Sequence, residues 1–273
     1  GRRQRQMCIR DRPSGVPVFV QLLGSDPTLM AANAARAATL GAPGIDLNFG
    51  CPAKTVNRSQ GGAALLRTPL LIKSICQAVR ERVPNTVPVT AKIRLGYDTE
   101  DQFAEILDAL AQVELSELTI HARTRRQGYR PPAHWHQLRQ ATQKMPYTVI
   151  ANGELWSPSD VTRCANISGC DTFMLARGAL CRPDLAAAIQ GHHRGIEPPA
   201  FAWQETQELL IQFLERNQQS YDDRYAVNPV KQWLMYLRIY YPQAGALFNE
   251  VKRINDPTHM AQALMAPSRS EAA

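Results

Sequence analysis

Six short runs of β-forming residues recur along the first two thirds of the chain, and most are followed by a segment with helical periodicity. The runs are almost continuously apolar, which is typical of parallel strands buried on both faces. Alternation of such strands with helices predicts an α/β fold with a parallel sheet, either doubly wound or closed into a barrel. The predicted strands span residues 16–21, 44–49, 87–93, 117–121, 147–151 and 172–175.

Helix-start signals support this alternation. Asp26-Pro27, Thr68-Pro69 and Ser157-Pro158 each place a capping residue before a proline, and they predict helices over 28–40, 70–83 and 159–165. The pattern changes after a short helix at 183–190. A linker rich in Gly, Pro and His is expected over 191–199, and helices are expected over 203–217, 229–241 and 243–254. These last segments predict a small all-α domain.

Six strand–helix units are two fewer than a closed eight-stranded barrel requires. We therefore expect a (β/α)8 TIM barrel that lacks its first two strands in this chain, followed by the helical domain. The arginine-rich residues 1–12 show no hydrophobic period, and residues 7–12 look like translated sequencing adapter. We expect a non-native or disordered leader there, although a natural basic arm that grips RNA is an alternative. The expected domains are a partial barrel over 13–191 and a helical domain over 200–266.

Composition sets the broad class. The 273 residues are 44% hydrophobic, which is enough for a large core. No apolar run reaches the roughly 18 residues that span a membrane, and no secretory signal is present. The six cysteines form no CxxC pair, so we expect no structural metal and a reduced, cytoplasmic protein. The net charge of +7 is compatible with solubility alone or with a nucleic-acid partner.

Polar or charged residues stand at the carboxyl end of every predicted strand. In a barrel these residues would converge on one mouth, where barrel enzymes place their chemistry. The loops after the last two strands commonly hold a phosphate through backbone N–H groups. The residues concerned are Gln21, Asn48, Cys51, Lys92, Arg94, His121, Arg123, Asn152, Gly153, Glu154, Ala176 and Arg177.

Two of these residues suggest reactive groups. Cys51 stands in a turn fixed by Gly50 and Pro52, where a thiol can act as nucleophile or proton donor. Because no triad-like partner is evident, we favour proton donation. Lys92 follows a buried strand, where an unpaired charge is costly, and this favours a ligand-binding role. Structural alternatives remain: His121 could be a core histidine, and the other cysteines are expected to be packing residues.

Two basic and aromatic segments suggest a large anionic partner. Residues 121–130 contain four arginines and Tyr129. Arginine suits phosphate groups, and tyrosine can stack on a base. Residues 231–238 combine Lys231, Tyr236 and Arg238 with apolar residues that are candidates for the helical core.

Taken together, these motifs resemble the bacterial tRNA-dihydrouridine synthase family, most closely its C-type members. The resemblance runs from about residue 14 to residue 264. Two segments depart from the family pattern: Ala176 stands where glycine is usual, and Pro229 where arginine is usual. The motifs that match are Val20-Gln21-Leu22-Leu23-Gly24, Asp46-Leu47-Asn48-Phe49-Gly50-Cys51-Pro52, Lys54-Thr55-Val56-Asn57, Gly61-Gly62-Ala63, Lys92-Ile93-Arg94-Leu95-Gly96, His121-Ala122-Arg123-Thr124, Gln127-Gly128-Tyr129, Ile150-Ala151-Asn152-Gly153-Glu154 and Lys231-Gln232-Trp233-Leu234.

The resemblance implies an FMN-binding barrel that reduces a uridine of the tRNA D-loop, at position 16, to 5,6-dihydrouridine. NADPH or NADH would be the reductant, and Cys51 would be the proton donor. Contacts to the flavin are implied for Gln21, Lys92, His121, Asn152, Gly153, Glu154, Ala176 and Arg177. Contacts to tRNA are implied for Asn48, Arg94, Tyr129, Lys231, Tyr236 and Lys252.

Two other functions stay open at this point. One is an FMN-barrel dehydrogenase that acts on a free pyrimidine, and the other is an inactive, truncated fragment that binds tRNA. The helical domain and the arginine-rich loop favour the tRNA enzyme over the first alternative. We expect tRNA as the partner, no membrane association, no metal ion and a monomer.

Overall fold

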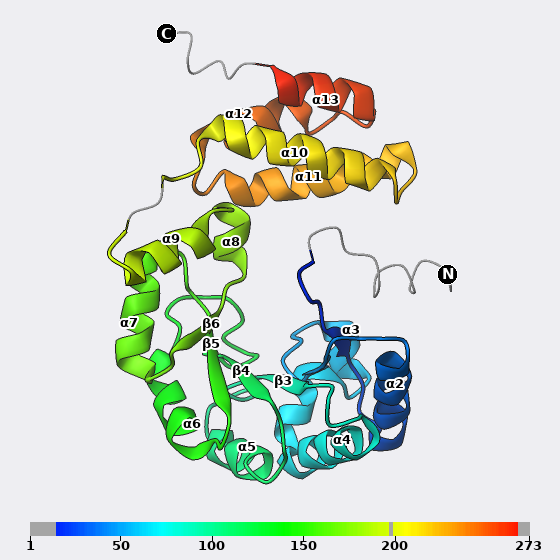
Figure 1. Ribbon diagram of the computed structural model, residues 1–273, viewed down its shortest axis with the longest axis vertical. Helices are drawn as coiled ribbons and strands as arrows, with labels where there is room; N and C mark the ends of the chain where they lie inside the picture. The colour runs from blue at the N-terminus through cyan, green and yellow to red at the C-terminus, as the bar shows by residue number, and fades with distance from the viewer. Residues whose placement is uncertain (1–14, 197–198, 267–273) are drawn as a thin grey trace. The chain divides into compact units, whose positions relative to one another are not determined.

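The computed structural model describes residues 15–196 and 199–266, so the leader expected over 1–12 lies outside the described residues. Six strands form one parallel sheet in sequence order, β1 to β6 (Figure 1). Consecutive order is that of a barrel, because a doubly wound sheet reverses its strand order at a switch point. The α/β prediction is confirmed, with six strands of a partial barrel. They are β1 (Val20–Leu22), β2 (Ile45–Asn48), β3 (Val89–Arg94), β4 (Glu117–His121), β5 (Thr148–Asn152) and β6 (Thr172–Met174).

The three predicted helices between the strands each begin within one residue of the expected position. Helix α2 starts at Pro27, and the Asp26 carboxylate accepts a hydrogen bond from Leu29 N at 2.9 Å. Helix α4 also starts at a proline, and Thr68 occupies its N-cap position, although the Thr68 side chain makes no capping hydrogen bond. The elements are α2 (Pro27–Thr39), α3 (Lys54–Arg58), the 3-10 helix η1 (Gly62–Arg67), α4 (Pro69–Arg82), α5 (Phe103–Leu110), η2 (Trp135–Gln137), α6 (Leu138–Lys144) and α7 (Pro158–Ser168).

The two faces of the sheet differ in polarity. Helices α2, α4, α5 and α6 lie along its outer side (Figure 1). Successive strand residues point to opposite faces, so one face can be apolar while the other is polar. Complete burial of each aliphatic side chain on the outer face contributes about 1.5–3 kcal/mol, which anchors the strands that carry the site. The fully buried outer residues include Ile45, Leu47, Val89, Ala91, Ile93, Leu118 and Ile120.

The chain divides into two compact units. The first contains the sheet and ends with Thr162–Met174, whereas the second comprises Leu155–Val161 and the residues from Leu175 onward. The core of the second unit is apolar and includes Trp203, Leu214, Leu234 and Met260. The domain boundary expected at the linker over 191–199 stays a prediction. The helices from Leu175 onward are α8 (Arg177–Cys181), α9 (Leu185–His193), α10 (Trp203–Gln218), α11 (Asp223–Leu237), α12 (Pro242–Val251) and α13 (Pro257–Met265).

Several helix boundaries in the second unit differ from the prediction. Helix α11 begins at Asp223 rather than at Pro229, because Asp222 occupies the N-cap position and Pro229 lies inside the helix. Helix α9 continues to His193, so it includes the first residues of the expected linker. Helix α13 was not predicted; it starts at Pro257, and the Asp256 carboxylate accepts from His259 N at 2.8 Å. In the described part of the chain, no helix is long and apolar enough to cross a membrane.

Candidate active site

Strand register gathers the predicted site residues on the inner face of the sheet. Asn48 in β2 pairs with Lys92 in β3. One layer further along, Arg94 pairs with His121, and His121 pairs with Asn152. Since parallel strands in register place paired residues on the same face, these five side chains share the face opposite the apolar one. The sequence prediction that strand ends deliver polar groups to one place is confirmed for β2 to β5.

The turn that carries Cys51 is held at several points. The Cys51 carbonyl accepts from Asn57 Nδ2 at 2.9 Å and from Ala63 N at 3.1 Å. Gly62 adopts a φ of +59°, and a Cβ there would lie 2.9 Å from Cys51 Cβ and from Cys51 O. Only glycine fits at this position without shifting the turn. Among the cysteines that the structure describes, Cys51 is the one that is not buried.

The remaining described cysteines behave as packing residues. Burial raises the pKa of Cys76, and it raises the pKa of Cys164 to about 12. Cys170 and Cys181 also have raised pKa values because of burial. Thiols with raised pKa values are poor nucleophiles and poor metal ligands. The described residues contain no group of three or more His, Cys, Asp or Glu side chains that could hold a metal ion.

Lys92 supplies a buried cation to the inner face. Its Nζ donates to Asn152 Oδ1 at 3.0 Å. Burial and then the charge of Arg94 lower the pKa of Lys92 to about 8, while the carboxylate of Asp46 acts in the opposite direction. An ammonium has three donors, so Lys92 retains donor capacity for an electron-rich ligand beside it. The expectation of a ligand-binding role therefore has a geometric basis.

A completely buried arginine organises the ends of β4 and β5. Arg123 forms an ion pair with Glu154, with 2.7 Å between Nη2 and Oε1. Its Nη1 lies 3.2 Å from His121 Nε2. Because a guanidinium group only donates hydrogen bonds, Nε2 is the acceptor and His121 carries its proton on Nδ1. Glu154, expected at the flavin, has a φ of +56° and also accepts from Ala133 N at 2.6 Å.

Arg123 is the main residue that the sequence reasoning undervalued. The sequence places it at a strand end without indicating a role, although a buried arginine requires a carboxylate partner. That partner, Glu154, follows the next strand and is 31 residues away along the chain. Gly153 fits the same arrangement: its φ is +120°, and a Cβ there would lie 3.1 Å from His121 Cδ2. The backbone after β5 therefore passes close beside the His121 ring.

Arg94 secures the arginine-rich loop after β4. It is 2% exposed, and it donates from Nε to Gly50 O at 2.8 Å and from Nη1 to Gly128 O at 3.0 Å. The guanidinium is therefore occupied by backbone carbonyls of two loops. Tyr129, by contrast, is 54% exposed, and its ring centroid lies 5.4 Å from Arg94 Cζ and 5.9 Å from the His121 ring.

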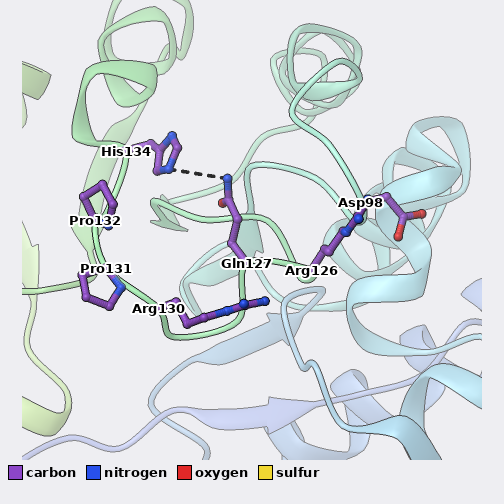
Figure 2. A pocket seen from close by; sticks show the side chains of 7 residues that line it. All are labelled: Asp98, Arg126, Gln127, Arg130, Pro131, Pro132 and His134. Atoms are coloured by element: carbon purple, nitrogen blue, oxygen red, sulfur yellow. Dashed lines mark hydrogen bonds between the residues drawn. The ribbon is translucent and has the colours of Figure 1, made fainter.

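A pocket of about 450 Å³ opens beside this loop (Figure 2). Gln127 shapes it by accepting from Thr124 N at 2.6 Å and donating to Glu100 Oε1 at 3.2 Å. His134 Nδ1 lies 3.1 Å from the same Glu100 oxygen. These interactions of Gln127 and His134 therefore hold in place the loop that carries the exposed arginines. The pocket is lined by Asp98, Arg126, Gln127, Arg130, Pro131, Pro132 and His134.

Gln21 lies in β1 of the first unit, and the second unit contains Ala176, Arg177, Lys231, Tyr236 and Lys252. Ala176 is the N-cap residue of α8, and the Arg177 guanidinium lies 5.1 Å from the centroid of Trp156. Lys231 Nζ donates to Asn255 Oδ1 at 3.2 Å, and burial lowers its pKa. Lys252 Nζ donates to Asn249 Oδ1 at 3.1 Å, and Tyr236 is 37% exposed.

Comparisons with known proteins point to one family. The family model described as "Dihydrouridine synthase (Dus)" matches residues 2–272. A "tRNA-dihydrouridine(16) synthase" of Aquipseudomonas alcaligenes is 47% identical over 251 residues, which cover 92% of this chain and 80% of that protein. The protein of the same description from Vibrio cholerae is 48% identical over 243 residues, covering 89% and 74% of the two chains. That of Escherichia coli O157:H7 is 44% identical over 255 residues, covering 93% and 79%.

Proposed function

The chain belongs to the dihydrouridine synthase family and is a flavin-dependent oxidoreductase, and from that premise we propose that it reduces uridine 16 of tRNA to 5,6-dihydrouridine. Relatives described as tRNA-dihydrouridine(16) synthases support both the reaction and the position. Within the proposal the flavin is FMN, and NADPH, or NADH in its place, is the reductant. Residues 200–266 would form the tRNA-binding domain.

A single observation supports the proposal most: a fixed turn with a thiol follows β2, and the strand that pairs with β2 carries a buried cation. The Cys51 turn follows β2 directly, and Lys92 pairs with Asn48 at the end of that strand. A purely structural barrel would have no use for an ammonium whose pKa is lowered to about 8 by burial. The combination suits a reaction in which negative charge develops and a proton is delivered.

The residues present fit a flavin. Flavin rings and pyrimidines carry carbonyl oxygens, and Lys92 has donor capacity beyond its hydrogen bond to Asn152. Gln21 and His121 would contribute further donors to the ring, since His121 carries its proton on Nδ1. Asn152, Gly153 and Glu154 would hold the ribityl-phosphate end. Gly153 supports this role because glycine there lets the backbone approach closely. The flavin contacts implied for Ala176 and Arg177 stay a prediction.

When bound, FMN supplies the hydride that reduces C6 of the uracil ring. Cys51 donates the proton to C5, so the C5–C6 double bond gains one hydride and one proton, and solvent reprotonates the thiolate. Lys92 stabilises negative charge that develops on the ring oxygens during this step. The hydrogen bonds from Asn57 and Ala63 to the Cys51 carbonyl fix the position of the thiol. A fixed position matters because a small displacement of a reacting group lowers the reaction rate strongly.

Recognition of tRNA would fall to two sets of residues. Tyr129 is exposed and suited to stacking on a base, and Asn48 lies next to the reacting turn. Arg94 is buried against Gly50 and Gly128, so its contribution would run through the loops that it holds. In the helical unit, Lys231, Tyr236 and Lys252 would contact the sugar–phosphate backbone.

The test is a mass measurement on defined substrates. Unmodified tRNA transcripts with U16 intact, or with U16 replaced by cytidine, are incubated with the protein, FMN and NADPH. Digestion and mass spectrometry should show a gain of two hydrogens at position 16 in the first transcript only. Reduction at another uridine would contradict the position, and reduction of free uracil or orotate without tRNA would favour the free-pyrimidine dehydrogenase.

A further inference from the structure

Asp46 is a charged residue of the inner face that the function proposed above does not use. It lies in β2, two residues before Asn48, and is half-buried. Its Oδ2 accepts from Gln21 Nε2 at 2.6 Å, and its Oδ1 accepts from Thr90 Oγ1 at 2.8 Å. Both carboxylate oxygens are therefore engaged by neighbouring strands.

The charge of Asp46 dictates the orientation of two amide side chains. An ionised carboxylate only accepts hydrogen bonds, so Gln21 must turn its NH2 group toward Asp46. Gln21 Oε1 then faces Asn48 and accepts from Asn48 Nδ2 at 2.9 Å. This leaves Asn48 Oδ1 to accept from the backbone N–H of Gly50 at 3.0 Å. Each amide is oriented by the group before it, and the series ends one residue before Cys51.

Gly50 is held at both of its backbone polar groups. Its N–H donates to Asn48, and its carbonyl accepts from Arg94 Nε at 2.8 Å. The peptide that links Gly50 to Cys51 therefore has a fixed orientation. If the Asn48 amide were free to flip, its NH2 group would face the Gly50 N–H, and one of the two anchors would be lost.

We propose that Asp46 is a positioning residue, which orients Gln21 and Asn48 and through them holds the turn that carries Cys51. The inference rests on the proposed function only where it concerns catalysis; the hydrogen-bonded series itself is independent of it. The second N–H of Gln21 is the donor that remains after Asp46 is satisfied. Gln21 therefore presents a donor to its ligand, and the ligand group beside it is a hydrogen-bond acceptor such as a carbonyl oxygen.

The first test measures hydrogen exchange at Gly50. The protein is labelled with 15N-glycine, and the Gly50 signal is assigned by its loss in Gly50→Ala, where the added Cβ meets only ordinary contacts. Asp46→Ala should raise the exchange rate of the Gly50 amide about tenfold, and Asp46→Asn by a smaller factor. Gly169, whose N–H donates to Ala165 O at 2.8 Å elsewhere, is the internal reference and should not change.

Thr90→Val is the matched control. It removes the other donor to Asp46 but leaves the charge and the Gln21 contact, so Gly50 exchange should stay within about twofold of the wild-type rate. Unchanged protection of Gly50 in Asp46→Ala would overturn the proposal. If both Asp46 variants lost exchange protection equally at the Gly50 and Gly169 amides, the proposal would also be overturned. Asp46 would then support the whole fold rather than the turn.

The second test measures kcat and KM separately, with tRNA as the varied substrate and NADPH in excess. Asp46→Ala should lower kcat for uridine reduction by about 10- to 100-fold, with a much smaller change in KM for tRNA. A rise in KM with an unchanged kcat would contradict a role in positioning the donor. If the wild-type protein reduces no uridine while the exchange result holds, the proposed function fails and the positioning role of Asp46 in the turn stands.

Discussion

Lys92 allows a quantitative prediction, because its ammonium lowers the stability of the folded protein. Burial, more than the neighbouring Arg94, lowers its pKa from 10.5 to about 8. The folded state therefore binds this proton less tightly than the unfolded state does. At about 1.36 kcal/mol for each pKa unit, the difference corresponds to roughly 3 kcal/mol of the free energy of unfolding.

The sign of the pH dependence follows from proton binding. Below pH 8 Lys92 is charged in both states, so the folded state bears the whole cost of burying the charge. Between pH 8 and 10.5 the unfolded state binds more protons than the folded state, and the contribution of this group to stability rises with pH. Cys76 and Tyr147 act in the opposite direction, because burial raises their pKa values.

Lys92→Met removes the charge and keeps a side chain of similar length. At pH 7 the flavin-free variant should be more stable than wild type by about 2 kcal/mol, since relief of the buried charge is offset by about 1 kcal/mol for the donor that Asn152 loses. The gain should fall toward zero near pH 10. Urea denaturation of both proteins at each pH measures the difference, and the comparison cancels the titration of Cys76 and Tyr147.

Lys73→Met is the matched control for this substitution. Lys73 also donates to a single amide oxygen, Gln112 Oε1 at 2.7 Å, but in an exposed contact between α4 and the turn after α5. Its removal should change the free energy of unfolding by no more than about 0.5 kcal/mol. A Lys92→Met protein that is no more stable than wild type at pH 7, or equally stabilised at both pH values, would refute the reasoning.

Three further predictions follow from the geometry of the site. Cys51→Ala should slow uridine reduction by about 10²-fold or more while NADPH still reduces the flavin at a near wild-type rate, and equal loss of both half-reactions would refute proton donation. Gly62→Ala should lower the free energy of unfolding by about 1–3 kcal/mol, because residue 62 has a left-handed backbone conformation and a methyl group there would meet Cys51. Gly128 is also left-handed but has open space around it, so Gly128→Ala should lower the free energy of unfolding by less in the same denaturation assay. Lys231→Ala should weaken tRNA binding in filter-binding titrations, by a factor that shrinks as salt rises; a salt-independent factor would argue against a phosphate contact.

Much of the sheet was predictable because its signals are local. The apolar runs locate all six strands to within a few residues, and the Asp26-Pro27 pair locates the start of α2. The same signal at Asp256-Pro257 marks α13, which was overlooked. Pro229 misled the prediction of α11, because a proline that appears to start a helix can also lie inside one when upstream residues already form the first turns.

The candidate site was predictable as a set of residue types but not as a network. The sequence places Asn48, Lys92 and His121 at strand ends, and the strand register then follows from the parallel order. It does not reveal that Arg94 faces inward onto backbone carbonyls, or that Arg123 and Glu154 pair. Both facts depend on contacts between residues 30 or more positions apart, or across two loops, and periodicity along one segment carries no such information.

The polar inner face and the apolar outer face depend on each other. Lys92 and Arg123 are buried cations; Asn152 at the end of β5 accepts a hydrogen bond from Lys92 and so offsets part of the cost of its burial, and Glu154, just after β5, forms an ion pair with Arg123. The apolar residues that alternate with them fix the strand register, and a slip of one residue would turn Lys92 toward the outer helices. The outer packing therefore keeps the charged groups in the positions at which they partner one another. It follows that a substitution in the outer core, such as at Ile93, can disturb the chemistry of the inner face by shifting the register rather than by touching the site.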